Sequence, residues 1–80
     1  SPKSHSRVGL GARVHLRDIA ADETFVDQLV GSAEADPTHS RISNESPVGQ
    51  AVIGAKKGDV VRVTTPRGSV IEYDVVSISK

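Results

Sequence analysis

The stretch from Ile42 to Gly54 constrains the fold more than any other part of this chain. Ser46 and Pro47 form a good helix start. A serine at the N-cap accepts a hydrogen bond from an unpaired backbone N–H, and a proline at the first helical position loses no bond. Gly54 suits the left-handed residue that ends a helix. The sequence therefore predicts one helix of about two turns, which is too short to be stable alone and must pack on a sheet.

Alternating apolar residues predict strands on both sides of this helix. The turn at residues 20–23 is too short for a crossover, so the first two strands should pair antiparallel. In the last strand the apolar face switches near Val75 and Val76, which predicts a bulge or a strong bend there. Pro66 to Gly68 predicts the final hairpin. We expect strands at residues 12–18, 24–30, 41–43, 60–65 and 69–79.

These elements predict an α+β fold: a strongly bent antiparallel sheet of four to five strands, with one short helix on its concave face. Residues 1–8 are expected to be a disordered linker or an expression remnant, and residues 9–80 one domain. Phe25 and Tyr73 are the only aromatic residues, so valine, isoleucine, leucine and alanine must build the core. A chain of this size buries roughly 60% of its unfolded surface, which leaves no room for a deep substrate cavity.

Charge and composition exclude several functions. Ten basic and ten acidic residues cancel, so the domain has no general attraction for phosphate backbones and should not bind nucleic acid directly. The chain contains no cysteine, hence no disulfide or thiolate metal site. No apolar run approaches the ~20 residues that span a membrane, and nothing resembles a signal peptide. We expect a monomeric, soluble protein of the cytoplasm with no membrane partner.

The residues that could carry chemistry form no convincing site. His5, His15 and His39 are scattered and have neither metal-ligand spacing nor an acidic partner pattern. Glu34 and Asp36 could together chelate a hard cation, but a cation needs more ligands, and a solvated loop explains them better. The serines do not occur in a nucleophile motif, and the glycines do not form a phosphate loop. The sequence predicts no catalytic residue, metal or cofactor.

The function class that remains is recognition of a partner at the protein surface. Residues 43–47 form an exposed turn between a strand and a rigid short helix, and loops on rigid scaffolds are frequent binding sites. Pro47 lowers the entropy cost of ordering this turn on a partner. The alternative is that the turn is a well-capped structural corner. The candidate binding residues are Ser43, Asn44, Glu45, Ser46 and Pro47.

Six segments, in the right order, resemble the C-terminal domain of the bacterial Gre transcript-cleavage factors. Each motif is weak alone, but together they cover about residues 9–79. They are Gly11–Leu16 (GARVHL), Leu29–Asp36 (LVGSAEAD), Ile42–Gly54 (ISNESPVGQAVIG), Gly58–Val61 (GDVV), Thr65–Gly68 (TPRG) and Glu72–Ile78 (EYDVVSI).

The resemblance implies an FKBP-like fold and a docking function. In Gre factors this domain anchors to the rim coiled coil of the RNA polymerase β′ subunit, at the secondary channel. The anchoring turn matches Asn44, Glu45, Ser46 and Pro47 here. The resemblance implies that Glu45, Ser46 and Pro47 are the central contacts and that Ser43 and Asn44 shape the turn. A separate N-terminal coiled coil carries the acidic residues that hold magnesium and promote RNA hydrolysis. This coiled coil is not in the chain, so the resemblance implies no cleavage activity for the fragment itself.

Gln50 stands where Gre factors usually have a basic residue, which raises the alternative of a divergent homologue. Such relatives include non-cleaving Gre-like inhibitors and Rnk-type regulators that share this domain. A generic protein-interaction module is a further alternative. The FKBP-like fold also suggests peptidyl-prolyl isomerase activity, but that site needs an aromatic-walled pocket, which Phe25 and Tyr73 cannot supply.

Overall fold

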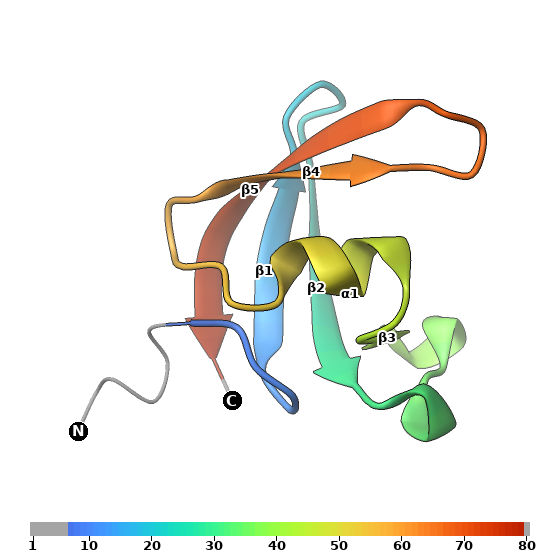
Figure 1. The fold of residues 1–80 in the computed structure, drawn as a ribbon. Helices are drawn as coiled ribbons and strands as arrows, with labels where there is room; N and C mark the ends of the chain where they lie inside the picture. The colour runs from blue at the N-terminus through green and yellow to red at the C-terminus, as the bar shows by residue number, and fades with distance from the viewer. Residues whose placement is uncertain (1–6, 80) are drawn as a thin grey trace.

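A single curled sheet of five strands organises the chain, with one short helix inside its curve (Figure 1). The structure, a computed structural model, describes residues 7–79. The strands lie in the order β3-β2-β1-β5-β4. Their bounds are β1 Arg13–Asp18, β2 Glu23–Val30, β3 Arg41–Ser43, β4 Val60–Thr64 and β5 Val70–Ser79; the helix α1 spans Pro47–Val52, and two 3₁₀ turns, η2 and η3, span Ser32–Glu34 and Pro37–His39.

The α+β architecture predicted from the sequence is confirmed, with one difference at a sheet edge. The pairs β1–β2, β1–β5 and β4–β5 are antiparallel, but β3 pairs parallel with β2. Between these two strands the chain passes through η2 and η3 and returns to the start of the pairing at Gln28 and Arg41. The sheet is therefore mixed rather than wholly antiparallel, because this loop acts as a short crossover.

The predicted bulge in the last strand is confirmed at Val76. His15 pairs with Ser77 and Leu16 pairs with Val75, so Val76 is left without a partner on β1. Val75 is fully buried, whereas Val76 is 41% exposed. Because Val76 is an extra residue in the strand, the Ile78 side chain points inward and packs against the core. A bulge also increases local twist, which fits the strong curl of the sheet around α1.

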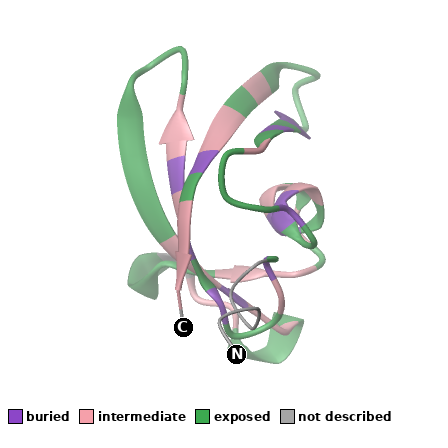
Figure 2. Ribbon diagram, turned by 90° about the vertical axis from the view of Figure 1, so that its left-hand side faces the viewer, coloured by how far each residue is buried: buried purple, intermediate pink, exposed green. Residues whose placement is uncertain are grey.

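The core is built from aliphatic side chains of the sheet and the helix, as the composition requires. Figure 2 shows that the buried segments of the strands and of α1 face one another across the inside of the curl. Phe25 is 43% exposed and contributes little to this core. The fully buried side chains are Val14, Leu16, Leu29, Val52 and Val75.

The chain joins this core earlier than the sequence suggested. Val8, placed in the lead-in segment, is only 3% exposed, and its backbone pairs with Ala55 and Gly54. Residues 1–6 of that segment lie outside the described residues. Gly54 adopts φ +79, as expected for the residue after the helix. No helix among residues 7–79 is long and apolar enough to cross a membrane.

Candidate functional site: the turn before the helix

The turn at residues 43–47 is closed by hydrogen bonds around the Ser43 carbonyl; we call it the docking turn, after the role that the family resemblance implies. That oxygen accepts from the backbone N–H of Ser46 at 3.0 Å and from the Ser46 hydroxyl at 2.7 Å. The Ser46 hydroxyl oxygen in turn accepts from the backbone N–H of Gly49 at 3.1 Å. Ser46 is therefore the N-cap that the sequence predicts, and its hydroxyl is fully used inside the turn.

A second set of hydrogen bonds ties the docking turn to the loop after β2. The Ser43 hydroxyl oxygen accepts from the Glu45 N–H at 2.9 Å, and the Ser43 and Ser32 hydroxyls lie 2.9 Å apart. The Ser32 hydroxyl donates to the Glu45 carboxylate. Because Ser32 has a single hydroxyl proton, Ser43 must donate to Ser32. The Asn44 N–H completes the link by donating to the Val30 carbonyl at 2.9 Å.

The five predicted binding residues divide into two groups by exposure. Ser43, Asn44 and Ser46 are half-buried and hold the turn in shape. Glu45 and Pro47 are exposed. The structure thus brings all five together in one ordered turn, of which Glu45 and Pro47 present the most surface to solvent. Gln50, also exposed, lies on α1 with its backbone N–H bonded to the Ser46 carbonyl.

Gly49 is a residue of this site that the sequence analysis missed. It is buried in α1, and a Cβ placed there would lie only 2.0 Å from the Ser43 carbonyl oxygen. The turn can fold this tightly onto the helix only because residue 49 has no side chain. Glycine is unfavourable inside a helix, so its position in a six-residue helix was the available signal of a close backbone approach.

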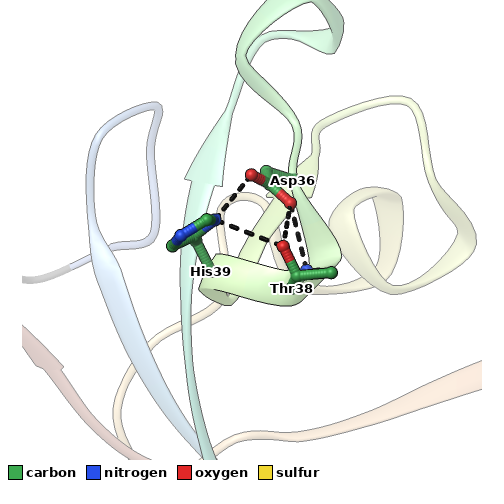
Figure 3. Close-up of polar contacts among 3 residues, drawn as sticks. All are labelled: Asp36, Thr38 and His39. Carbon is green, nitrogen blue, oxygen red and sulfur yellow. Dashed lines mark hydrogen bonds and ion pairs between the residues drawn. The ribbon is translucent and has the colours of Figure 1, made fainter.

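The loop beside the docking turn is braced by Asp36, Thr38 and His39 (Figure 3). The Asp36 carboxylate accepts from the Thr38 hydroxyl at 2.6 Å and from the Thr38 N–H at 3.1 Å, and lies 2.6 Å from His39 Nδ1. The hydrogen bonds from Thr38 and His39 lower the pKa of Asp36. The expectation that no histidine has an acidic partner is therefore wrong for His39.

The other candidates for chemistry do not converge. His15 is half-buried on β1, and His5 lies outside the described residues. Glu34 folds back on its own turn, where its carboxylate would lie 3.1 Å from a Cβ at Gly31. No group of three or more histidine, cysteine, aspartate or glutamate side chains within residues 7–79 is placed to hold a metal ion. The arrangement offers an ordered turn on which Glu45 and Pro47 are exposed.

Comparison with known proteins finds similarity to transcription elongation factors. The family model described as "Transcription elongation factor, GreA/GreB, C-term" matches residues 3–80. Transcription elongation factors GreA from Clostridium beijerinckii and Acetivibrio thermocellus are each 49% identical over 73 residues, which is 91% of this chain and 45% of the relative. The chain thus spans about half the length of the curated relatives it matches.

Solved structures agree. The crystal structure of GreA factor homolog 1 (Gfh1) of Thermus thermophilus superposes with a TM-score of 0.80 at 38% identity, covering 100% of this chain and 53% of that one. The elongation factor GreA/GreB from Nitrosomonas europaea gives 0.77 at 28% identity, covering 94% and 62%. The matched residues include the docking turn, α1 and all five strands. This chain belongs to the GreA/GreB family of transcription elongation factors, to whose C-terminal domain it corresponds.

Proposed function

We propose that this chain anchors a Gre-family factor to RNA polymerase, by placing the docking turn on the rim coiled coil of the β′ subunit at the secondary channel. One observation carries the proposal: the turn is ordered by its own hydrogen bonds, yet Glu45 and Pro47 remain exposed. A preordered turn loses little conformational entropy when it binds, and its outward residues are free to contact a partner.

We also infer that the fragment has no RNA-cleavage activity of its own. The family resemblance assigns the magnesium-holding acidic residues to a separate coiled coil, and the curated relatives are about twice as long as this chain. The chain would then act as a monomeric anchor in the cytoplasm, holding its parent protein at the channel.

A binding titration of the chain against the isolated β′ rim coiled coil tests the anchor. We expect saturable binding that a GreA protein competes away. Glu45→Lys together with Pro47→Ala should weaken binding by at least about tenfold, which corresponds to about 1.4 kcal/mol. Ser46 is unsuitable for this purpose because its substitution removes the helix cap.

The matched control is Glu23→Lys, which makes the same charge reversal on the exposed start of β2, away from the docking turn. It should bind like the parent chain. Thermal midpoints of all variants must agree within a few degrees for the comparison to count. Normal binding by the double variant would exclude Glu45 and Pro47 from the interface. Failure of the unsubstituted chain to bind at high micromolar concentration would contradict the anchor itself.

A further inference from the structure

A small groove on the outer face of the sheet, away from α1, gathers positive charge. Its volume is about 180 Å³, and it lies across β1, β2 and β3. Side chains alternate between the two faces of a strand, and the neighbouring Val14 and Leu29 point into the core. Arg13 and Gln28, which are next to Val14 and Leu29 in their strands, therefore point outward. The groove is lined by Arg13, Val26, Gln28, His39, Ser40 and Arg41.

The register of the sheet places two arginines on either side of one glutamine. Arg13 pairs with Gln28 across β1 and β2, and Gln28 pairs with Arg41 across β2 and β3. Two strand spacings separate the arginine backbones by about 10 Å, a gap that two long side chains can close from both sides. The Gln28 side chain is held by donating to the Gly11 carbonyl at 3.2 Å.

These two arginines differ from others on the sheet. Arg17 pairs with Asp22 and Asp74, and Arg62 pairs with Glu72. Among the described residues, neither Arg13 nor Arg41 has a carboxylate within 4.0 Å.

The positive charge of Arg41 contributes to lowering the pKa of Asp36. The Asp36 carboxylate, however, is already bonded to Thr38 and His39. Two guanidinium groups and no carboxylate line the groove, so it keeps a net positive charge.

The groove and the docking turn both include residues of the short strand β3. Arg41 and Ser43 lie two residues apart on β3, so they point to the same side of the strand, about 7 Å apart along it. A partner that contacts the docking turn would reach the groove without a second binding event. The volume of the groove is below the 300–1,000 Å³ typical of cofactor and drug-sized ligand pockets, so the groove fits a single anionic group.

We propose that this groove receives a carboxylate side chain of the protein on which the docking turn binds; this inference rests on the proposed docking function. Planar guanidinium groups suit carboxylates, because they donate paired hydrogen bonds in a fixed geometry. Nucleic acid fits less well, since its repeated phosphates would meet Asp36 and Glu45 on the adjoining loop and turn. The groove thus adds a salt-dependent contact to the docking surface.

The test compares two double variants that each remove two positive charges. Arg13→Gln with Arg41→Gln removes both positive charges from the groove. Arg62→Gln with Arg67→Gln removes the same charge from the β4–β5 hairpin at the other side of the sheet. One arm measures NMR shifts on adding a short glutamate peptide at low salt. The other measures affinity for the β′ rim coiled coil.

We expect the peptide to shift groove resonances saturably in the parent chain and in the hairpin variant, but not in the groove variant. Rim affinity should fall about three- to tenfold in the groove variant alone, and the difference should shrink at high salt. Shifts scattered over all arginines, or equal rim affinity in both variants, would overturn the inference and leave docking intact. Peptide binding in the groove without rim binding by the parent chain would instead reject the docking function and, with it, the partner assigned to the groove.

Discussion

Asp27 is a carboxylate on the inner side of the sheet, where it pairs across the strands with the fully buried Val14. Its partial burial raises its pKa, because the charged form is poorly solvated there. Tyr73 is also partly buried, and this burial raises its pKa, with additional contributions from the charges of Asp18 and Asp27. An ionised Asp27 is therefore a cost to the fold near neutral pH.

Asp27→Asn should raise the thermal midpoint at about pH 7. A carboxylate whose pKa is higher in the folded state stabilises the fold below its unfolded pKa of about 3.9, and this contribution is lost as pH rises through the folded pKa. The advantage of the variant should therefore disappear at about pH 3. The pKa of Tyr73 should also fall in the variant, which a spectroscopic titration of the single tyrosine can detect.

Glu23→Gln is the matched control, since it neutralises an exposed carboxylate on the same strand and should change stability by less than about 0.5 kcal/mol. A lower midpoint for Asp27→Asn at neutral pH would show that the carboxylate makes a contact that outweighs its burial.

Single residues were predictable from the sequence only where their role is local. The Ser46 cap, the left-handed Gly54 and the inward Val14 and Leu16 follow from neighbours in the chain. The contact of Asp36 with His39 depends on the backbone of the 3₁₀ turn η3, and the contact of Ser32 with Glu45 depends on how the loop and the docking turn fold together. Sequence spacing gives no measure of those distances.

At the scale of elements, the approach of α1 to β3 determines the shape of the docking turn. Gly49→Ala would place a methyl group against the Ser43 carbonyl oxygen at 2.0 Å, so strand and helix would have to separate. We expect a loss of at least about 1–3 kcal/mol in urea unfolding, as for overpacked cores. The rearranged turn should also bind the β′ rim more weakly.

Gly9→Ala is the control for this substitution, because a Cβ at Gly9 meets nothing within 4 Å. It should leave stability nearly unchanged. If Gly49→Ala proved as stable as Gly9→Ala, the helix would have room to move, and the turn would not be held by that close approach.

The elements themselves were largely predictable, but one pairing was not. Alternating apolar residues gave β1, β2, β4 and β5 within a residue or two at each end, and the Ser46–Pro47 pair gave the start of α1. Three residues of β3 carry no directional signal, and its parallel partner depends on the path of the loop through η2 and η3. A short edge strand takes its orientation from its connection, which periodicity does not describe.

At the scale of the whole molecule, the curl of the sheet holds α1 against the core, and the bulge at Val76 contributes to that curl. Deleting Val76 would leave a regular ladder in which Val75 and Ile78 still point inward and Ser77 still points outward, opposite His15. The deletion therefore keeps the apolar pattern of β5 intact and removes the source of extra twist. The deletion therefore tests whether the bulge is needed to bend the sheet, separately from its role in turning Ile78 inward.

We expect the Val76 deletion to fold but to lose about 1–3 kcal/mol, because a flatter sheet packs less well around Val52 of α1. Amide resonances of α1 should shift more than those of the β1–β2 turn. Val76→Thr, which keeps the bulge and nearly the same shape at a 41% exposed position, should cost far less. Equal stability of the two variants would mean that the twist of the paired strands alone curls the sheet, so that the bulge serves only to restore the inward face of Ile78.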